Sequence, residues 1–203
     1  MSALGRRRRG ALGRDVRGVA AVEFGILSIP LCICLLGMID AGYFMYVRSD
    51  LQGVLNDVAR QATVQTPNFS GTGTLSQKID NAIQTRMGSL VHSGSYAITK
   101  TSYYKFSSVG KPEKLTKDVN GNGKYDVGDC FQDDNGNGVW DTDSGKSGAG
   151  SADDVVVYTV TLTIPRIVPM TSLIGLPANY TVVAKATVHN QPYANQPAPA
   201  VVC

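Results

Sequence analysis

The sequence predicts an α+β fold in which a long N-terminal helix carries a small head domain. Three observations support this prediction. An uncharged apolar run from Phe24 to Ile39 continues, at helical spacing, to about Thr66. A second amphipathic stretch and three strand-like stretches follow. A segment rich in Asp, Asn and Gly, residues 118–144, interrupts the strands as a loop insertion.

The apolar run is long enough to cross a membrane. Within residues 19–47 the only side chains expected to be charged are Glu23 and Asp40, and about 20 apolar residues in a helix span the hydrocarbon. A removable secretory signal is the competing interpretation, but its apolar core has roughly 7 to 15 residues and ends in a small-residue cleavage site. We therefore predict a transmembrane helix over 19–47 and a helical extension over 48–66, which Pro67 ends.

The residues before the apolar run are strongly basic. Six arginines against Asp15 give residues 1–18 a net charge of +5, which leaves −2 for the rest of a chain whose total is +3. Positive charge beside a span stays in the cytoplasm, so we expect this leader inside and the head domain outside. The basic balance is thus a topology signal and does not indicate a nucleic-acid partner.

The junction between leader and span resembles a known family. Gly18 precedes small apolar residues and Glu23, as in the type IV prepilin processing site. The string RGVAAVEFGIL is similar to the N-terminal signature of the TadE-like pseudopilins of the tight-adherence (Tad) pilus system. The resemblance covers residues 14–66, and the ending 187–193 is also similar, with Gln191 where Glu is commoner. The middle of the chain carries no motif of this family.

The resemblance implies that a prepilin peptidase cuts between Gly18 and Val19. The new amine of Val19 and Glu23 of a neighbouring subunit would then pair, since two charges that are costly alone in a membrane become tolerable together. Phe24 stands where major pilins often have Tyr. An alternative is that Glu23 only reaches the lipid headgroups. The implied partners are other pilins and pseudopilins, the Tad assembly platform, the peptidase and the bacterial inner membrane, with the head domain in the periplasm or in the extracellular pilus.

Asp40 is the second acid in the apolar run. We expect it at the periplasmic membrane interface, where Tyr43 and Tyr46 would form an aromatic belt. Pairing of Asp40 with another subunit is the alternative.

The head domain, residues 67–190, is predicted to contain one helix and three strands. Thr74 and Gln77 fit a capping box at the start of an amphipathic helix. Strands are expected at 95–106, 155–164 and 180–188. We expect these strands to form a small antiparallel sheet on the two helices. The Pro-rich tail, residues 191–203, is expected to trail away, because proline cannot extend a sheet.

Oxygen-bearing side chains recur at fixed spacing between the first two strands. A twelve-residue loop from Asp118 carries them at positions 1, 3, 5, 9 and 12, with Gly123 at position 6, as in the calcium loop of EF-hands. Position 7, Lys124, would contribute its backbone carbonyl. The predicted Ca²⁺ ligands are Asp118, Asn120, Asn122, Lys124, Asp126 and Asp129.

The pattern repeats 15 residues later. Its predicted ligands are Asp133, Asn135, Asn137, Val139 and Asp141. The twelfth residue is Ser144, a poor ligand, so we expect Asp143, Asp153 or Asp154 to replace it. Tandem loops without intervening helices are more similar to dockerin or thrombospondin type-3 calcium repeats than to paired EF-hands. A turn-rich loop without metal is the alternative, because Asn, Asp and Gly also favour turns for conformational reasons.

The cysteines fit an exported protein. Cys130 and Cys203 are the two outside the span, and in an oxidising compartment we expect them to pair and fasten the tail to the Asp/Asn-rich segment. Cys32 and Cys34 fall in the span, where cysteine behaves as a small apolar residue.

The motifs favour assembly over catalysis. The chain has only two histidines, His92 and His189, and no nucleophile elbow. We therefore predict a membrane-anchored, calcium-stabilised pseudopilin or minor pilin that takes part in assembling a Tad-type adhesive pilus, and not an enzyme. The alternative is a monomeric calcium-dependent adhesin or binding module, with the helix as a simple anchor.

Overall fold

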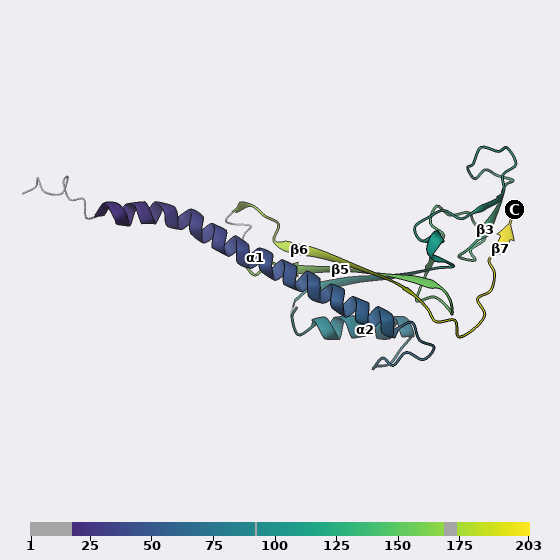
Figure 1. Ribbon diagram of the computed structural model, residues 1–203, viewed down its shortest axis with the longest axis horizontal. Helices are drawn as coiled ribbons and strands as arrows, with labels where there is room; N and C mark the ends of the chain where they lie inside the picture. Colours follow the sequence, from purple (N-terminus) through teal and green to yellow (C-terminus); the bar gives the residue numbers. More distant parts are fainter. Residues whose placement is uncertain (1–17, 92, 169–173) are drawn as a thin grey trace, which may run out of the picture.

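The computed structural model describes residues 18–91, 93–168 and 174–203. It confirms an α+β architecture, in which one long N-terminal helix is followed by a second helix and two small antiparallel sheets (Figure 1). The basic leader predicted for residues 1–18 lies, apart from Gly18, outside the described residues.

Helix α1 runs without interruption from Val19 to Gln61, with Pro30 inside it. It ends a few residues earlier than predicted, because the last turn tightens: the Ala62 N–H is shared between the carbonyls of Val58 and Ala59. Before Asp40 no side chain of α1 is buried, and the buried face begins there. The buried residues of α1 are Asp40, Val47, Leu51, Leu55, Val58 and Ala59.

Helix α2 runs from Leu75 to Met87 and confirms the predicted capping box. The Thr74 hydroxyl accepts the N–H of Gln77, and the Gln77 side chain accepts the N–H of Thr74. Its apolar stripe is buried against α1, since Ile79 and Ile83 are fully covered. Asp57 and Arg86 add an ion pair between the two helices.

The larger sheet has the strand order β4-β1-β5-β6, and all its pairs are antiparallel. Its strands are β1 (Ser95–Tyr103), β4 (Lys146–Ser147), β5 (Val155–Pro165) and β6 (Asn179–His189). The three predicted strands are therefore confirmed to within a few residues. The first is shorter than expected because a 3-10 turn, η3 (Phe106–Ser108), begins where β1 was predicted to end.

The core lies between the larger sheet and the two helices. Alternate residues of β5 and β6 are buried, so one face of each strand points into the core. Tyr158, Val160 and Leu162 of β5 are fully covered, as are Leu51 and Leu55 of α1. The amphipathic half of α1 thus forms the layer on which the larger sheet packs.

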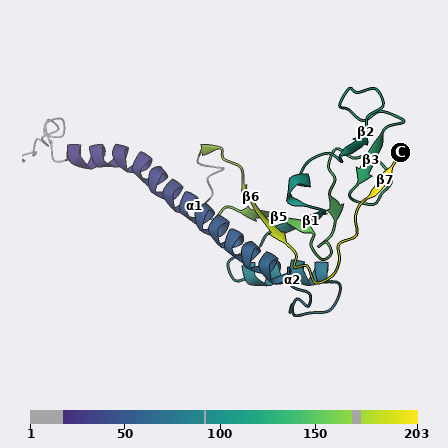
Figure 2. The same cartoon turned by 45° about the vertical axis from the view of Figure 1, so that its right-hand side comes forward.

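The smaller sheet corrects the prediction for the tail. It consists of β2 (Leu115–Lys117), β3 (Cys130–Asp133) and β7 (Ala200–Val202) in the order β2-β3-β7 (Figure 2). The tail therefore does not trail away, because its last residues follow Pro199, keep their N–H groups and pair with β3. The disulfide between Cys130 and Cys203, the pairing favoured by the sequence, holds β7 in place.

Strand β6 runs along α1 in the same direction. Near its start, the Tyr180 hydroxyl donates to the Asp40 carbonyl at 2.8 Å. Further along, the Gln52 amide donates to the Lys185 carbonyl at 2.9 Å. The start of β6 therefore faces the N-terminal half of α1, and the smaller sheet lies at the opposite end of the molecule (Figure 1).

Candidate functional site

The residues predicted to serve in processing and assembly lie at the start of α1. Gly18 occupies the N-cap position, with no side-chain hydrogen bond capping the helix, and Val19 is the first helical residue. Glu23 is exposed on the first turns, next to Phe24, whose side chain is 70% exposed. No ion pair between described residues involves Glu23. This end of the helix presents an acid and an apolar surface to its surroundings.

Asp40 is paired within its own chain, which differs from the intersubunit pairing considered above. Its carboxylate is buried and bonded to the guanidinium of Arg166, which follows β5. That guanidinium also lies 4.1 Å from the ring centre of Tyr180. Burial, with the neighbouring Asp40 carboxylate, raises the pKa of Tyr180 to about 12. The acid thus fastens the head domain to α1 where the helix becomes covered.

The two Asp/Asn-rich loops, which we call loop I (118–129) and loop II (133–144), begin with the same hydrogen-bond pattern. Asp118 accepts the N–H groups three and five residues further on, both at 2.7 Å. Asp133 does the same at 2.7 and 2.8 Å. The four donors are glycines with φ between 71° and 77°, a conformation costly for other residues.

The ninth residue of each loop is also bound in the same way. Asp126 accepts the side-chain amides of Asn120 and Asn122 at 2.8 and 2.7 Å. These hydrogen bonds lower the pKa of the Asp126 carboxyl. In loop II, Asp141 accepts the side-chain amides of Asn135 and Asn137, both at 2.7 Å.

The twelfth position distinguishes the loops. In loop I, Asp129 accepts the N–H groups of the second and ninth residues, at 2.9 and 2.8 Å. In loop II the corresponding N–H groups belong to Asp134 and Asp141, and both donate to the carboxylate of Glu113, at 2.9 and 3.2 Å. Glu113 therefore takes the place that Ser144 cannot fill.

The three acids expected to replace Ser144 lie elsewhere. Asp143 accepts the hydroxyl of Tyr103 at 3.3 Å, and Asp153 pairs with His189 at 3.1 Å. Asp154 accepts the Gln196 side chain at 2.7 Å. Sequence reasoning missed Glu113 because it precedes both loops. The missing twelfth carboxylate was the one signal that a residue from outside loop II was needed.

Glu113 is well buried, with 3% of its surface exposed. Burial is the main cause that raises the pKa of its carboxyl, while the N–H groups of Asp141 and Asp134 oppose the shift. Its backbone carbonyl accepts the indole N–H of Trp140 at 3.1 Å. Trp140 in turn stacks on Tyr125 of loop I, with ring centres 5.1 Å apart. These contacts join the two loops into one unit.

The donor set of each loop fits a hard cation only if neutral oxygens take part. Among the described residues, no three side chains of His, Cys, Asp or Glu gather closely enough to hold a metal ion by themselves. Each loop does offer three carboxylates: Asp118, Asp126 and Asp129 in loop I, and Glu113, Asp133 and Asp141 for loop II. Asparagine oxygens and the backbone carbonyls of the seventh residues, Lys124 and Val139, would have to complete the set.

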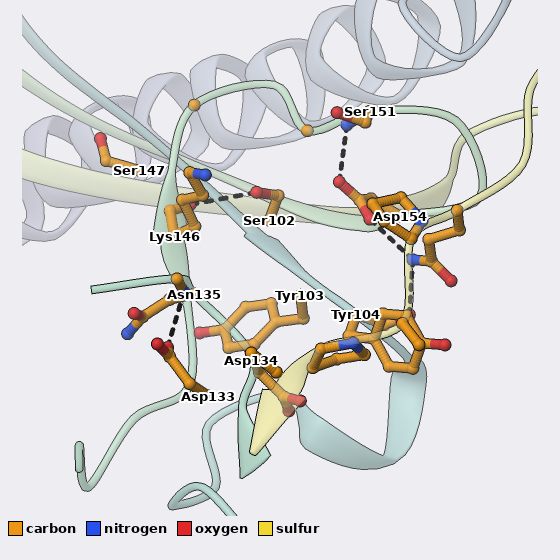
Figure 3. Close-up of a pocket in the computed structure, with 18 of the residues that line it drawn as sticks. Ser102, Tyr103, Tyr104, Asp133, Asp134, Asn135, Lys146, Ser147, Ser151 and Asp154 are labelled. Carbon is orange, nitrogen blue, oxygen red and sulfur yellow. Dashed lines mark hydrogen bonds between the residues drawn. The ribbon is translucent and has the colours of Figure 1, made fainter. Parts of the chain in front are cut away.

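A cavity of about 500 Å³ lies where the two sheets meet (Figure 3). On one wall the Ser102 hydroxyl donates to the backbone carbonyl of Lys146 at 3.2 Å. On the other wall Asp154 accepts the N–H of Ser151 at 2.6 Å. Gln196 of the tail bridges Asp154 and the Tyr104 carbonyl. Gln196 thus uses polar groups of this cavity to hold the tail against the larger sheet.

The comparisons with known proteins agree with this geometry. Among the described residues, one helix of 43 residues is apolar enough at its N-terminal end to cross a membrane, and it leads into an α+β head, which is consistent with a membrane-anchored pilin. The model of the family described as TadE-like protein matches residues 18–60, which confirms the resemblance read in the sequence. The chain thus carries a TadE-like N-terminal region, and the same region contains a candidate membrane span. No curated protein and no solved structure matches it.

Proposed function

We propose that this protein is a pseudopilin or minor pilin that takes part in assembling a Tad-type adhesive pilus. The observation that carries the proposal is the TadE-like match over 18–60, which includes both the Gly18–Val19 junction and Glu23. A structural partner explains why an acid lies exposed near the start of an apolar helix, since such an acid is costly in lipid unless it is paired. Its partners are other pilins and pseudopilins and the assembly platform of the inner membrane.

Processing by a prepilin peptidase is part of this proposal. Cleavage between Gly18 and Val19 removes the arginines and leaves a mature chain whose amine lies one helical turn from Glu23. With the leader in the cytoplasm, the head domain lies in the periplasm before assembly.

Mass spectrometry of the mature N-terminus tests the processing step. In a host with the peptidase, the chain is expected to begin at Val19, and Gly18→Leu is expected to leave it uncut. A chain that still begins near Met1 in such a host would overturn this step.

Glu23→Ala tests the assembly step. We expect it to abolish or strongly reduce surface pili while the processed protein remains in the membrane. Asp50→Ala, which removes a carboxylate further along α1, is the matched control and is expected to leave piliation unchanged. Normal piliation with Glu23→Ala would contradict a role in assembly.

We further propose that loops I and II each hold a Ca²⁺ ion that stabilises the smaller sheet. The support is the shared hydrogen-bond pattern, which reappears at the twelfth position although its carboxylate comes from a different part of the chain. Calcium prefers six to eight oxygen ligands and accepts neutral ones. Bound Ca²⁺ would cross-link oxygens from both ends of each loop and so oppose unfolding.

Thermal unfolding with Ca²⁺ and with a chelator tests the metal, because a cation that binds the folded state raises the midpoint. Calorimetric titration with Ca²⁺ is expected to show two sites, of which Asp129→Asn removes the first and Glu113→Gln the second. Asp143→Asn is the control, since that acid bonds outside both loops. Equal midpoints with Ca²⁺ and with chelator would exclude a structural metal.

One observation favours the adhesin as a second candidate. The loops lie at the end of the molecule far from the start of α1 (Figure 1), beside a groove of about 870 Å³. Its rim includes Lys105, Lys111, Lys114 and Lys124. An adhesin would retain surface binding with Glu23→Ala and lose it with Asp118→Ala.

A further inference from the structure

The described parts of the loop between β5 and β6 lie at the end of the head domain that faces the N-terminal half of α1. Because β6 runs along α1 in the same direction, residues 174–178, which precede β6, project toward that half of the helix (Figure 1). The described parts of this loop are residues 166–168 and 174–178.

The length of the uncovered part of α1 places a bilayer surface at the level of the β5–β6 loop. From Val19 to Ile39 no α1 side chain is buried by the rest of the chain. This stretch rises about 30 Å at 1.5 Å per residue, which matches the hydrocarbon thickness of a bilayer. Asp40, the first covered residue, pairs with Arg166 at the start of the β5–β6 loop. The outer edge of the hydrocarbon and this loop therefore lie beside the same turn of α1.

The loop presents apolar side chains on both sides of that turn. Ile174 is 52% exposed and borders a cavity of about 470 Å³, whose other wall includes Gly37 and Ala41 of α1. Ile167 is 62% exposed and borders a smaller cavity beside Tyr43. Exposed isoleucines are unfavourable in water and favourable at a lipid surface.

The only ionisable side chain between Pro165 and Asn179 is bonded within the fold. That side chain is Arg166, whose guanidinium is bonded to the buried Asp40 and donates to the Pro177 carbonyl at 2.6 Å. Its charge is therefore neutralised within the fold. A loop built in this way meets little electrostatic cost on entering the headgroup region.

We propose that the two described ends of the β5–β6 loop, residues 166–168 and 174–178, dock on the periplasmic leaflet, with Ile167 and Ile174 inserted at the boundary between headgroups and acyl chains. The partner is the lipid surface that surrounds α1, because the loop continues the apolar surface of the span on the same side of the molecule. This inference rests on the proposed membrane span. It does not depend on calcium or on pilus assembly. It gives the protein a second membrane contact, which fixes the head domain against the bilayer before any assembly.

Tryptophan quenching in lipid nanodiscs tests this docking. The full chain is reconstituted at one copy per disc, in phosphatidylcholine brominated near the headgroup end of one acyl chain. Ile167→Trp and Ile174→Trp are each expected to lose roughly half of the added emission, because the interface lies within reach of these bromines. The parent, whose single Trp140 lies in loop II, supplies the background. Val127→Trp, at a fully exposed position of loop I, is expected to remain unquenched.

Ile26→Trp separates a failure of docking from a failure of the span. It lies in the uncovered part of α1 and is expected to be quenched in any protein that crosses the bilayer. Quenching at Ile26→Trp without quenching at Ile167→Trp and Ile174→Trp would overturn the docking and leave the span intact. No quenching at any of the three positions would overturn both. Quenching of the loop variants only in discs with several copies would assign the surface to a second chain and also overturn the proposal.

Discussion

The two sheets of this protein are held together by different means. The larger sheet packs on α1 and α2 through fully covered apolar side chains such as Leu51, Ile83 and Tyr158. The smaller sheet has few such residues, chiefly Phe131. It relies instead on the Cys130–Cys203 disulfide, the stacked aromatic pair and the hydrogen bonds of loops I and II. A unit too small to bury a core is thus stabilised by cross-links and polar networks.

The largest effect is expected from opening the core of the larger sheet. Leu51→Ala removes a fully buried side chain, and such changes cost about 2 to 5 kcal/mol of unfolding free energy. Urea unfolding in detergent, followed by far-UV circular dichroism, measures this loss. Val127→Ala, at an exposed position, is the control. A midpoint equal to that of the control would show that α1 is not part of the core.

The next largest effect is expected from opening the disulfide. Cys203→Ser releases a cross-link across 73 residues and is expected to cost about 2 to 4 kcal/mol, with the loss confined to the smaller sheet. Trp140 fluorescence should then change at lower urea concentration than the circular dichroism of α1 and β5. Cys32→Ser in the span is the control. If both signals shifted together, the two sheets would form one cooperative unit.

A smaller effect is expected at the junction between the sheets. Asn190 is buried and its amide donates to the carbonyls of Ala149 and Ser151, at 3.1 and 2.8 Å. Asn190→Ala leaves both carbonyls without this donor, which costs about 1 to 3 kcal/mol. Asn190→Ala is expected to speed amide hydrogen exchange in residues 148–154 and to change the exchange rates of β5 and β6 less. Asn68→Ala, at an exposed position, should leave exchange unaltered.

The smallest effect is expected inside the larger sheet at neutral pH. The Tyr158 hydroxyl has no hydrogen-bond partner among the described residues, so Tyr158→Phe is expected to change the unfolding free energy by less than about 1 kcal/mol. Measurement of thermal midpoints at neutral pH checks this, and a loss as large as that of Leu51→Ala would reveal an unseen partner.

The same variant is expected to differ from the parent in alkali. Burial raises the pKa of Tyr158 from 10.0 to about 12. Above pH 10 the unfolded chain releases this proton while the folded chain retains it, so stability falls as the pH rises from 10 to 12. Tyr158→Phe removes that part of the fall. Parallel midpoint curves for parent and variant across this range would contradict the assignment.

The sequence predicts the parts of this protein that depend on local pattern. The capping box at Thr74, the strand predicted at 155–164 and the long apolar helix all rest on local signals, and each lies within a few residues of its expected place. The turns of loops I and II can likewise be predicted, because the spaced glycines specify which residues adopt a positive φ.

Long-range contacts could not be predicted in the same way. Arg166 is far from Asp40 in the sequence, and Glu113 precedes the loop that it completes, so no spacing rule connects either pair. The prediction for the tail was wrong because it rested on the prolines, whereas the three residues Ala200–Val202 after them form a strand. Their strand depends on β3 and on a disulfide, both distant in the chain.

The unbroken length of α1 has a mechanical consequence. The helix passes from the apolar span to the head domain without a hinge, and β6 and the Asp40–Arg166 pair grip it along its covered half. Such a helix acts as a lever of about 65 Å at 1.5 Å per residue. Rotating its axis by about 10°, well within the tilts common for membrane helices, swings the distal end by roughly 10 Å. For a helix near the bilayer normal, a change in tilt therefore moves loops I and II sideways over the membrane surface.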